Sequence, residues 1–121
     1  MIGVGTDLVD VDRFRRVLTR TPGITERLFS AAEREYADAA RDPTERYAVR
    51  FAAKEAAMKA LGVVLGEIRM IDIEVVRAES GQPSLRIHGS AADLADRMGV
   101  ENWHLSLSHT AQVAHAIAIA V

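Results

Sequence analysis

The sequence has 121 residues, a formal net charge of −2 and no cysteine. Its 49% hydrophobic content is too high for an intrinsically disordered chain, and its length fits one domain, which we expect to span residues 1–121. The lack of cysteine excludes disulfide bridges, thiolate metal sites and a cysteine nucleophile. The weak charge argues against a nucleic-acid partner. No basic leader followed by an apolar run opens the chain, so we expect a cytoplasmic protein.

The beginning of the chain predicts a strand followed by a helix. Residues 2–6 are short and apolar with two glycines, which indicates a strand that ends at Asp7. Asp10 can cap a helix whose apolar positions follow the i, i+3, i+4 spacing, namely Phe14, Val17 and Leu18. This helix should end at the Thr-Pro-Gly sequence of residues 21–23.

Two further helices are predicted before the middle of the chain. Ser30 and Glu33 have the spacing of a capping box, which predicts a helix to about Arg41. Pro43 suits the first position of a third helix, which should end at Gly62. This third helix is the longest element and the richest in alanine.

The next segment predicts a hairpin and a short helix. Residues 70–77 are rich in β-branched side chains, residues 79–83 have the composition of a turn, and residues 84–88 alternate as a returning strand. Ser90 can cap a helix that stops at Gly99.

Residues 102–121 contain no Asp, Glu, Lys or Arg, and this length could span a membrane as a helix. Histidines and hydroxyl side chains in its first half instead favour two strands, residues 103–108 and 113–121, with no membrane contact. The second strand alternates large apolar residues with alanine, so both of its faces are apolar and it should be central. Its alanine face suits the alanine-rich helix. We therefore expect an α+β fold with an antiparallel sheet packed against that helix.

Four features carry chemical groups. Asp7 follows Gly3 and Gly5, and a carboxylate there suits Mg²⁺, although it could equally cap a turn. Glu55 and Lys59 lie four residues apart on one helical face, flanked by alanines that would leave space for a ligand. They could hold Mg²⁺ and phosphate, or form an ordinary surface ion pair. His109 follows a predicted strand and could bind phosphate or close a turn.

The fourth feature is a row of arginines on the first predicted helix. Arg13, Arg16 and Arg20 lie opposite its apolar positions. In a chain with a net negative charge, such a basic face could attract an acidic protein or a phosphate-bearing ligand, or it could simply be solvated.

Together and in this order, these motifs resemble holo-acyl-carrier-protein synthase, the short bacterial type of 4′-phosphopantetheinyl transferase. The resemblance spans residues 1–121. It rests on Gly-Val-Gly-Thr-Asp-Leu-Val at residues 3–9, Arg-Phe-Ala-Ala-Lys-Glu-Ala at 50–56 with Lys-Ala-Leu-Gly at 59–62, and Leu-Ser-Leu-Ser-His at 105–109.

The resemblance implies transfer of phosphopantetheine from coenzyme A to a serine of apo acyl carrier protein, for fatty acid biosynthesis, with Mg²⁺ bridging the pyrophosphate. It implies the α+β transferase fold and a homotrimer with sites between subunits. The catalytic base stays open between Glu55 and a metal-bound water.

Several residue roles follow from the family motif. Asp7 and Glu55 would be metal ligands, and Lys59 the cation that binds phosphate and assists the leaving group. Coenzyme A phosphates would contact Arg50, His109 and Thr110. Arg13 matches the position that docks the carrier protein, and Arg16 and Arg20 extend that face.

Two residues depart from this pattern. Thr6 stands where the family often has an apolar residue, and His115 interrupts an otherwise apolar strand, where we expect a hydrogen-bonded histidine at a subunit interface. Two alternative functions remain. One is a non-catalytic oligomeric α+β module that binds an acidic protein through its arginine helix. The other is a Mg²⁺-dependent hydrolase of phosphate esters.

Overall fold

The computed structural model describes residues 1–63 and 66–121 and has the expected α+β class. Its elements in chain order are β1 (Gly3–Asp10), α1 (Val11–Arg20), α2 (Ile24–Leu28), α3 (Ala31–Asp38), α4 (Thr44–Leu61), the 3₁₀ turn η1 (Met70–Asp72), β2 (Ile73–Arg77), β3 (Pro83–Ile87), α5 (Gly89–Arg97), β4 (Trp103–His109) and β5 (Val113–Ala120).

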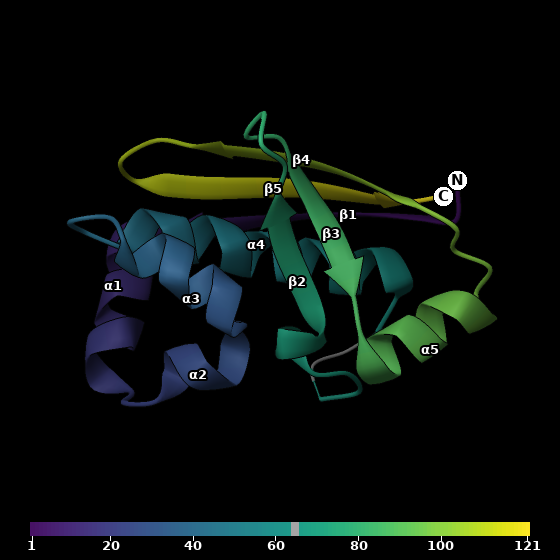
Figure 1. The fold of residues 1–121 in the computed structure, drawn as a ribbon, viewed down its shortest axis with the longest axis horizontal. Coiled ribbons are helices and arrows are strands. Elements are labelled where there is room, and N and C mark those ends of the chain that lie inside the picture. Colours follow the sequence, from purple (N-terminus) through teal and green to yellow (C-terminus); the bar gives the residue numbers. More distant parts are fainter. Residues whose placement is uncertain (64–65) are drawn as a thin grey trace.

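The strands form two antiparallel sheets. One has three strands in the order β1-β5-β4, and the other is the β2–β3 hairpin, which crosses the direction of the larger sheet (Figure 1). The predicted central position of β5 is confirmed, since β5 pairs with β1 on one side and β4 on the other. The chain therefore folds its first and last strands side by side, which brings the beginning of β1 next to the end of β5.

Helix α4 packs against one face of the three-stranded sheet, as the alanine patterns predict. The alanines of β5 are fully buried on that face: Ala114, Ala116, Ala118 and Ala120. On β1, a Cβ atom added to Gly5 would lie 1.8 Å from the carbonyl oxygen of Ala56, and one added to Gly3 would lie 1.9 Å from that of Ala60. Only glycine at both positions allows the two backbones to approach this closely.

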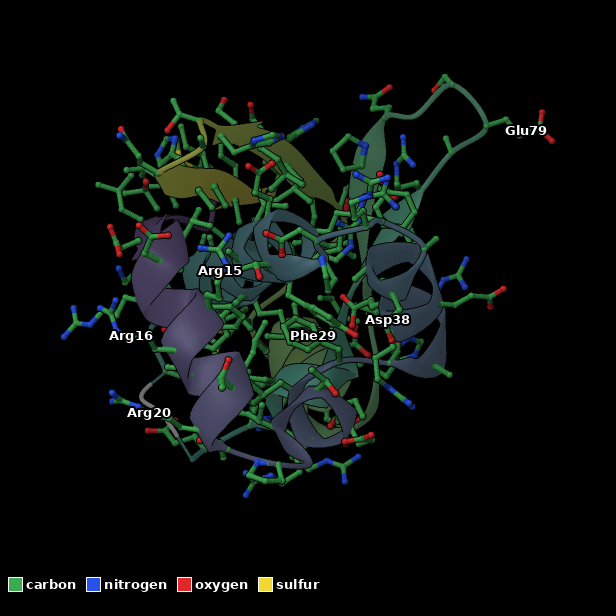
Figure 2. All side chains as sticks on the ribbon, turned by 90° about the vertical axis from the view of Figure 1, so that its left-hand side faces the viewer. Arg15, Arg16, Arg20, Phe29, Asp38 and Glu79 are labelled. Carbon is green, nitrogen blue, oxygen red and sulfur yellow. The ribbon has the colours of Figure 1, made fainter. Side chains whose placement is uncertain are left out.

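Helices α1 to α3 cover the end of α4 near its N-terminus and enclose a second cluster of core side chains. The aromatic rings of Phe29 and Tyr47 lie 4.8 Å apart between centroids, and those of Phe14 and Phe51 lie 5.1 Å apart. Phe29 points into this core, while Arg16 and Arg20 of α1 point outward (Figure 2).

A buried ion pair joins α3, α4 and the start of β2. Nζ of Lys54 lies 2.8 Å from Oε1 of Glu33, and both side chains are fully buried. The same ammonium donates to the carbonyl oxygens of Met70 and Ile73, and Oε2 of Glu33 accepts from the backbone N–H of Val75. Each charge is thus compensated and hydrogen-bonded, as buried charges must be.

Several predicted boundaries in the first half were wrong. The first strand runs on through Asp7 to Asp10, because its pairing with β5 continues to Val113. The Ser30 capping box is present, but its helix ends at Asp38 rather than near Arg41. Pro43 precedes α4 instead of opening it. Helix α2 was not predicted, since Gly23 precedes it without a side-chain cap.

The second half shows similar shifts. Residues 70–72 form a 3₁₀ turn instead of the beginning of a strand, and the pairing of β2 with β3 begins only at Ile73. The returning strand covers residues 83–87 rather than 84–88, and His88 rather than Ser90 precedes α5. Residues 102–121 form the two expected strands. Within the described ranges, no helix has both the length and the apolar character needed to cross a membrane.

Candidate active site

Asp7 lies in the middle of β1, on the face of the strand that looks toward α4. Side chains alternate between the two faces of a strand, so Gly3, Gly5, Asp7 and Val9 share this face. Gly5 brings the strand close to the helix, and Asp7 follows two residues later with its side chain 16% exposed. The glycines therefore set how near a carboxylate on β1 comes to side chains on α4.

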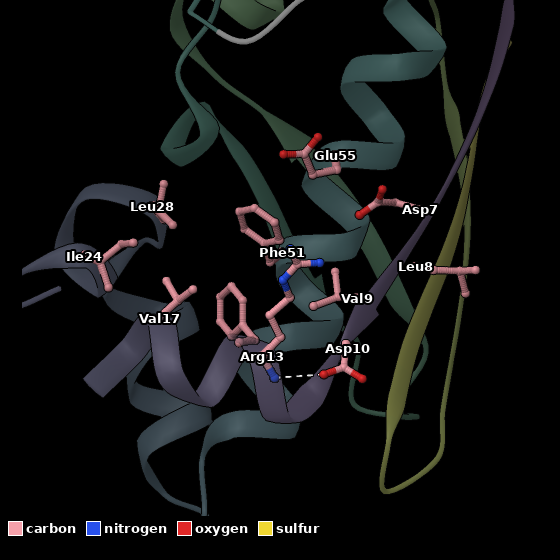
Figure 3. A pocket seen from close by; sticks show the side chains of 11 residues that line it. Asp7, Leu8, Val9, Asp10, Arg13, Val17, Ile24, Leu28, Phe51 and Glu55 are labelled. Atoms are coloured by element: carbon pink, nitrogen blue, oxygen red, sulfur yellow. Dashed lines mark hydrogen bonds between the residues drawn. The ribbon is translucent and has the colours of Figure 1, made fainter. Parts of the chain in front are cut away.

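Asp7 and Glu55 line the same cavity, which has a volume of about 440 Å³ and lies between β1, α1, α2 and α4 (Figure 3). The remaining lining is largely apolar and includes Phe14, Phe51 and Leu28. Burial and the negative charge of Asp7 raise the pKa of Glu55, and Lys59 partly opposes this. The two carboxylates thus act on each other electrostatically.

Lys59 reaches from α4 to β1 and pairs with Asp7. Its Nζ lies 3.0 Å from Oδ1 of Asp7 and 2.9 Å from the carbonyl oxygen of Thr6. The simple alternative, an ion pair with Glu55 four residues away, is therefore not the contact that Lys59 makes in this structure. Its side chain is 54% exposed, which leaves the ammonium accessible to an anionic ligand.

The small residues near Glu55 act differently from our expectation. Ala48, Ala52 and Ala56 are fully buried in the core. They leave no space for a ligand. Ala56 instead allows β1 to approach α4, and the ligand space lies on the other side of Glu55, toward α1 and α2.

The donors of this cavity fit a magnesium ion. Mg²⁺ prefers carboxylate oxygens and is commonly held by one or two carboxylates together with substrate phosphates. Asp7 and Glu55 supply two such groups. Among the residues that the structure describes, no cluster of three or more His, Cys, Asp or Glu side chains suits a metal ion. A magnesium ion held by Asp7 and Glu55 would take its remaining oxygen ligands from substrate phosphates and water.

Arg50 and His109 lie together in a second cavity of about 480 Å³, which shares no lining residue with the first. Arg50 is 4% exposed, and within the described residues its buried Nε has no hydrogen-bond partner. Burial lowers the pKa of this guanidinium. His109 approaches Glu45, with Nδ1 3.6 Å from Oε2. A buried cation with an unused donor beside an open cavity is suited to bind an anion.

Sequence reasoning missed two further arginines in this second cavity. Arg46, Arg50 and Arg77 place their guanidinium carbons 4.0, 4.3 and 4.5 Å from the ring centroid of Tyr36. All four residues line the cavity. Arg46 could have been suspected, since it lies one helical turn before Arg50. Arg77 gave no signal, because a charged residue at a strand end is ordinary.

Thr110 lies beside these groups in sequence and stabilises the turn between β4 and β5. Its Oγ1 accepts hydrogen bonds from the backbone N–H groups of Gln112 and Val113, each at 3.1 Å. The structure therefore gives Thr110 a local structural role.

The arginines of α1 are exposed, as predicted. Arg16 and Arg20 project from the outer side of the helix (Figure 2). Arg13 is also exposed, but it lines the first cavity together with Asp7 and Glu55 (Figure 3). The basic surface of α1 thus begins at the edge of the carboxylate cavity. Arg15, by contrast, is bound to Asp12 and Asp42.

Comparison with known proteins places these features in a family. Residues 3–120 match the model of the 4′-phosphopantetheinyl transferase superfamily. A holo-[acyl-carrier-protein] synthase from Frankia alni is 52% identical over 120 residues, covering 99% of this chain and 97% of that protein. The protein of the same name from Streptomyces avermitilis is 47% identical over 120 residues, again covering 99% of this chain and 97% of that protein.

Solved structures agree with this assignment. The holo-[acyl-carrier-protein] synthase of Neisseria meningitidis has a TM-score of 0.89 and 27% identity, covering 100% of this chain and 99% of that one. The Helicobacter pylori synthase in complex with coenzyme A has a TM-score of 0.85 and 27% identity, covering 98% of this chain and 99% of that one. The match over nearly the whole chain confirms the resemblance drawn from the motifs, and this chain belongs to the 4′-phosphopantetheinyl transferase superfamily.

Proposed function

We propose that this protein, as a single domain over residues 1–121, is a holo-acyl-carrier-protein synthase. It transfers 4′-phosphopantetheine from coenzyme A to a serine of apo acyl carrier protein, in the cytoplasm and in support of fatty acid biosynthesis. The observation that carries the proposal is the meeting of Asp7, Glu55 and Lys59 beside one cavity. The non-catalytic alternative explains the arginines of α1 but gives these three residues no joint role.

The reaction breaks one phosphoanhydride bond and forms one phosphoester bond. The serine oxygen attacks the phosphorus that carries the pantetheine arm, and the bond from that phosphorus to the bridging oxygen breaks. Adenosine 3′,5′-bisphosphate leaves with the bridging oxygen, and the serine proton is released. Such transfers depend chiefly on alignment and on neutralising phosphate charge.

Asp7 and Glu55 of the first cavity, and Lys59 bound to Asp7, each suit one part of this chemistry. Asp7 and Glu55 would hold Mg²⁺, which when bound neutralises charge on the pyrophosphate. The exposed ammonium of Lys59 would bind a phosphate oxygen and stabilise the leaving group. The apolar walls formed by Phe14 and Phe51 would exclude water from the serine.

The second cavity would bind the 3′-phosphate of coenzyme A through Arg50 and His109, and Thr110, the next residue in the chain, would hold the turn that follows His109. On one chain these residues and the carboxylates line separate cavities. Arg50 and Glu55 are five residues apart, which places them about 140° apart around α4. This separation supports a homotrimer in which one copy supplies the carboxylates and its neighbour supplies the arginines.

The outer face of the three-stranded sheet supports the same assembly. Val4 is 56% exposed and Leu8 is 69% exposed on β1, and Val113 and Ile117 on β5 are also exposed. An apolar face of this kind commonly marks an interface between protein chains. A second copy of the chain would cover it.

The exposed arginines of α1 suit an acidic carrier protein, because they adjoin the carboxylate cavity through Arg13. Arg16→Glu should raise the KM for the carrier at least tenfold, with kcat near the wild-type value, since rim charges act mainly on association. Arg97→Glu, on the exposed side of α5, is the matched control and should leave the KM unchanged. Equal effects of the two substitutions would contradict docking on α1.

The test of the activity is mass spectrometry of apo acyl carrier protein incubated with the protein, coenzyme A and Mg²⁺. We expect the mass of one phosphopantetheine to be added, and the addition to be lost with EDTA and in Asp7→Asn. The control Asp93→Asn replaces an exposed carboxylate on α5 and should remain active. No addition to any carrier, together with no thermal stabilisation by coenzyme A, would favour the non-catalytic module. Release of phosphate without a carrier would favour the hydrolase.

A further inference from the structure

We infer that Thr6 and His115 form a polar pair that fixes how copies of this chain pack against one another. The inference rests on the homotrimer proposed above and concerns one surface. We call this surface the outer face, made by the side chains of β1 and β5 that point away from α4: Val4, Thr6, Leu8, Asp10, Val113, His115, Ile117 and Ile119.

Apart from Asp10 at the end of β1, the outer face is apolar except at its centre. The opposite side of β5 is occupied by buried alanines, so the alternating residues of β5 must lie on the outer face. Of its eight side chains, Asp10 carries a charge, and its carboxylate is already used as the N-terminal cap of α1. A strand surface destined for water would carry more charged residues, so this composition indicates a surface that is covered by protein.

Thr6 and His115 are bound to each other across the two strands. Oγ1 of Thr6 lies 2.8 Å from Nε2 of His115. The register pairs Leu8 with His115 and Thr6 with Ile117, so the bonded pair is diagonal and is flanked by these two large apolar side chains. Within the described part of the chain, Nδ1 of His115 has no hydrogen-bond partner, which leaves it for a group on a neighbouring copy.

When a second copy covers this face, the side chains of Thr6 and His115 are buried together and keep their mutual hydrogen bond. A buried polar group without its partner costs much more than a satisfied pair, whereas replacing both partners with apolar groups is nearly neutral. A single polar pair inside an apolar interface also favours one packing register over its alternatives. The cost of breaking the pair is repeated in every copy of the assembly.

The pair therefore predicts a specific pattern among three variants. Thr6→Val and His115→Leu each leave one partner unsatisfied, so each should raise the concentration for half-dissociation at least tenfold. The double variant Thr6→Val/His115→Leu should assemble at least as tightly as the wild type, but into a mixture of sizes. Ser106→Ala, which removes an exposed hydroxyl on neighbouring β4, is the matched control and should change nothing.

Analytical ultracentrifugation of the full-length chain across a range of concentrations tests this pattern, with Leu8→Arg as a probe of the face itself. A trimeric wild type that Leu8→Arg dissociates confirms the interface. If the double variant dissociates as much as the two single substitutions together predict, the role of the pair is overturned. The same holds if neither single substitution changes dissociation. In both cases the homotrimer itself stands. A wild type that stays monomeric, with Leu8→Arg unchanged in mass, would overturn the assembly and the pair together. The mass-spectrometric assay of phosphopantetheine transfer tests the proposed activity independently of this result.

Discussion

Nζ of Lys59 lies 3.0 Å from Oδ1 of Asp7, so a side chain from the last turn of α4 is bound to the middle of β1. This contact places a positive charge beside two carboxylates that share a cavity. It both steadies Asp7 and reduces the negative charge that a metal ion would meet.

Replacement of Lys59 should separate metal binding from turnover. In Lys59→Met, the carboxylates lose a competing cation, so Mg²⁺ should bind several-fold more tightly by calorimetry. Turnover should fall by about 10²–10³, because the phosphate loses a stabilising charge in the transition state. Weaker Mg²⁺ binding in this variant would contradict the placement of the metal on Asp7.

Substitution of Gly5 should change both stability and activity. A Cβ at this position would lie 1.8 Å from the carbonyl oxygen of Ala56, so Gly5→Ala must push β1 away from α4. We expect a loss of about 1–3 kcal/mol in the free energy of unfolding by urea titration, and a loss of turnover at temperatures where the variant is folded.

Gly62→Ala is the control for Gly5→Ala. Gly62 has a φ of 70° and no neighbour within 4 Å of an added Cβ. It should cost about 1–2 kcal/mol through backbone strain alone, with turnover of the folded enzyme retained. Normal turnover of folded Gly5→Ala would show that the position of β1 matters less than proposed.

The buried pair of Lys54 and Glu33 should contribute strongly to the free energy of unfolding, because it ties α3 to α4 and β2. Lys54→Met leaves the Glu33 carboxylate buried without its counter-charge, at a cost of about 3–5 kcal/mol. Adding Glu33→Gln should recover part of this loss, because it removes the isolated charge while keeping an acceptor for Val75. Urea denaturation measures the free energy of unfolding of both variants. If Lys54→Met/Glu33→Gln is less stable than Lys54→Met alone, the argument is contradicted.

Arg50 should distinguish coenzyme A from dephospho-coenzyme A. Arg50→Met removes the buried guanidinium from the second cavity, and a charge-assisted hydrogen bond contributes about 1.5–3 kcal/mol. Coenzyme A binding by calorimetry should therefore weaken about 10- to 100-fold, while dephospho-coenzyme A binding should change little. Equal losses for both ligands would place the 3′-phosphate elsewhere.

Asp42 predicts an acid-dependent contribution to stability. Hydrogen bonds from Thr44, together with Arg15, lower the pKa of Asp42 to about 2. Because the folded pKa is below the unfolded value of about 3.9, its contribution is complete above that value and disappears as the pH falls toward 2. Asp42→Asn should lower the thermal midpoint by a few degrees, about 2–5 °C, at pH 7. The difference from wild type should shrink between pH 4 and pH 2.5, and a constant difference would contradict the assignment.

The sequence predicted best those elements whose pattern repeats within one segment. Strands β4 and β5 alternate clearly and were correctly placed, and helix α4, predicted from Pro43, Gly62 and its alanines, begins one residue later than expected. Asp7 was taken for a strand end, because the apolar run of residues 2–6 stops there, although the strand itself continues to Asp10. Asp7 is tolerated inside the strand because Lys59 pairs with it, and that partner is 52 residues away in the sequence.

The candidate site could be predicted only in part from the sequence, because its contacts also join residues that are far apart in the chain. Spacing along one helix relates Glu55 to Lys59, but it cannot show that Lys59 turns toward β1 instead. Arg77 joins Arg50 only through the packing of β2 beside Tyr36, a contact that no local pattern encodes. The family motif supplied Asp7 and Glu55 together, and the glycines of β1 provide the physical reason that they can meet.

The adjacency of the two chain ends makes the connectivity of this fold nearly circular. The backbone N–H of Ile2 donates to the carbonyl oxygen of Ala120, and the backbone of Val121 is hydrogen-bonded to that of Asn102, which directly precedes β4. A short peptide could therefore join the ends, and the exposed hairpin tip at Glu79 offers a place to open the chain (Figure 2). In such a permuted order, β1 and β5 would become one continuous hairpin, and the carboxylate cavity would be built from the same contacts in a chain that begins elsewhere.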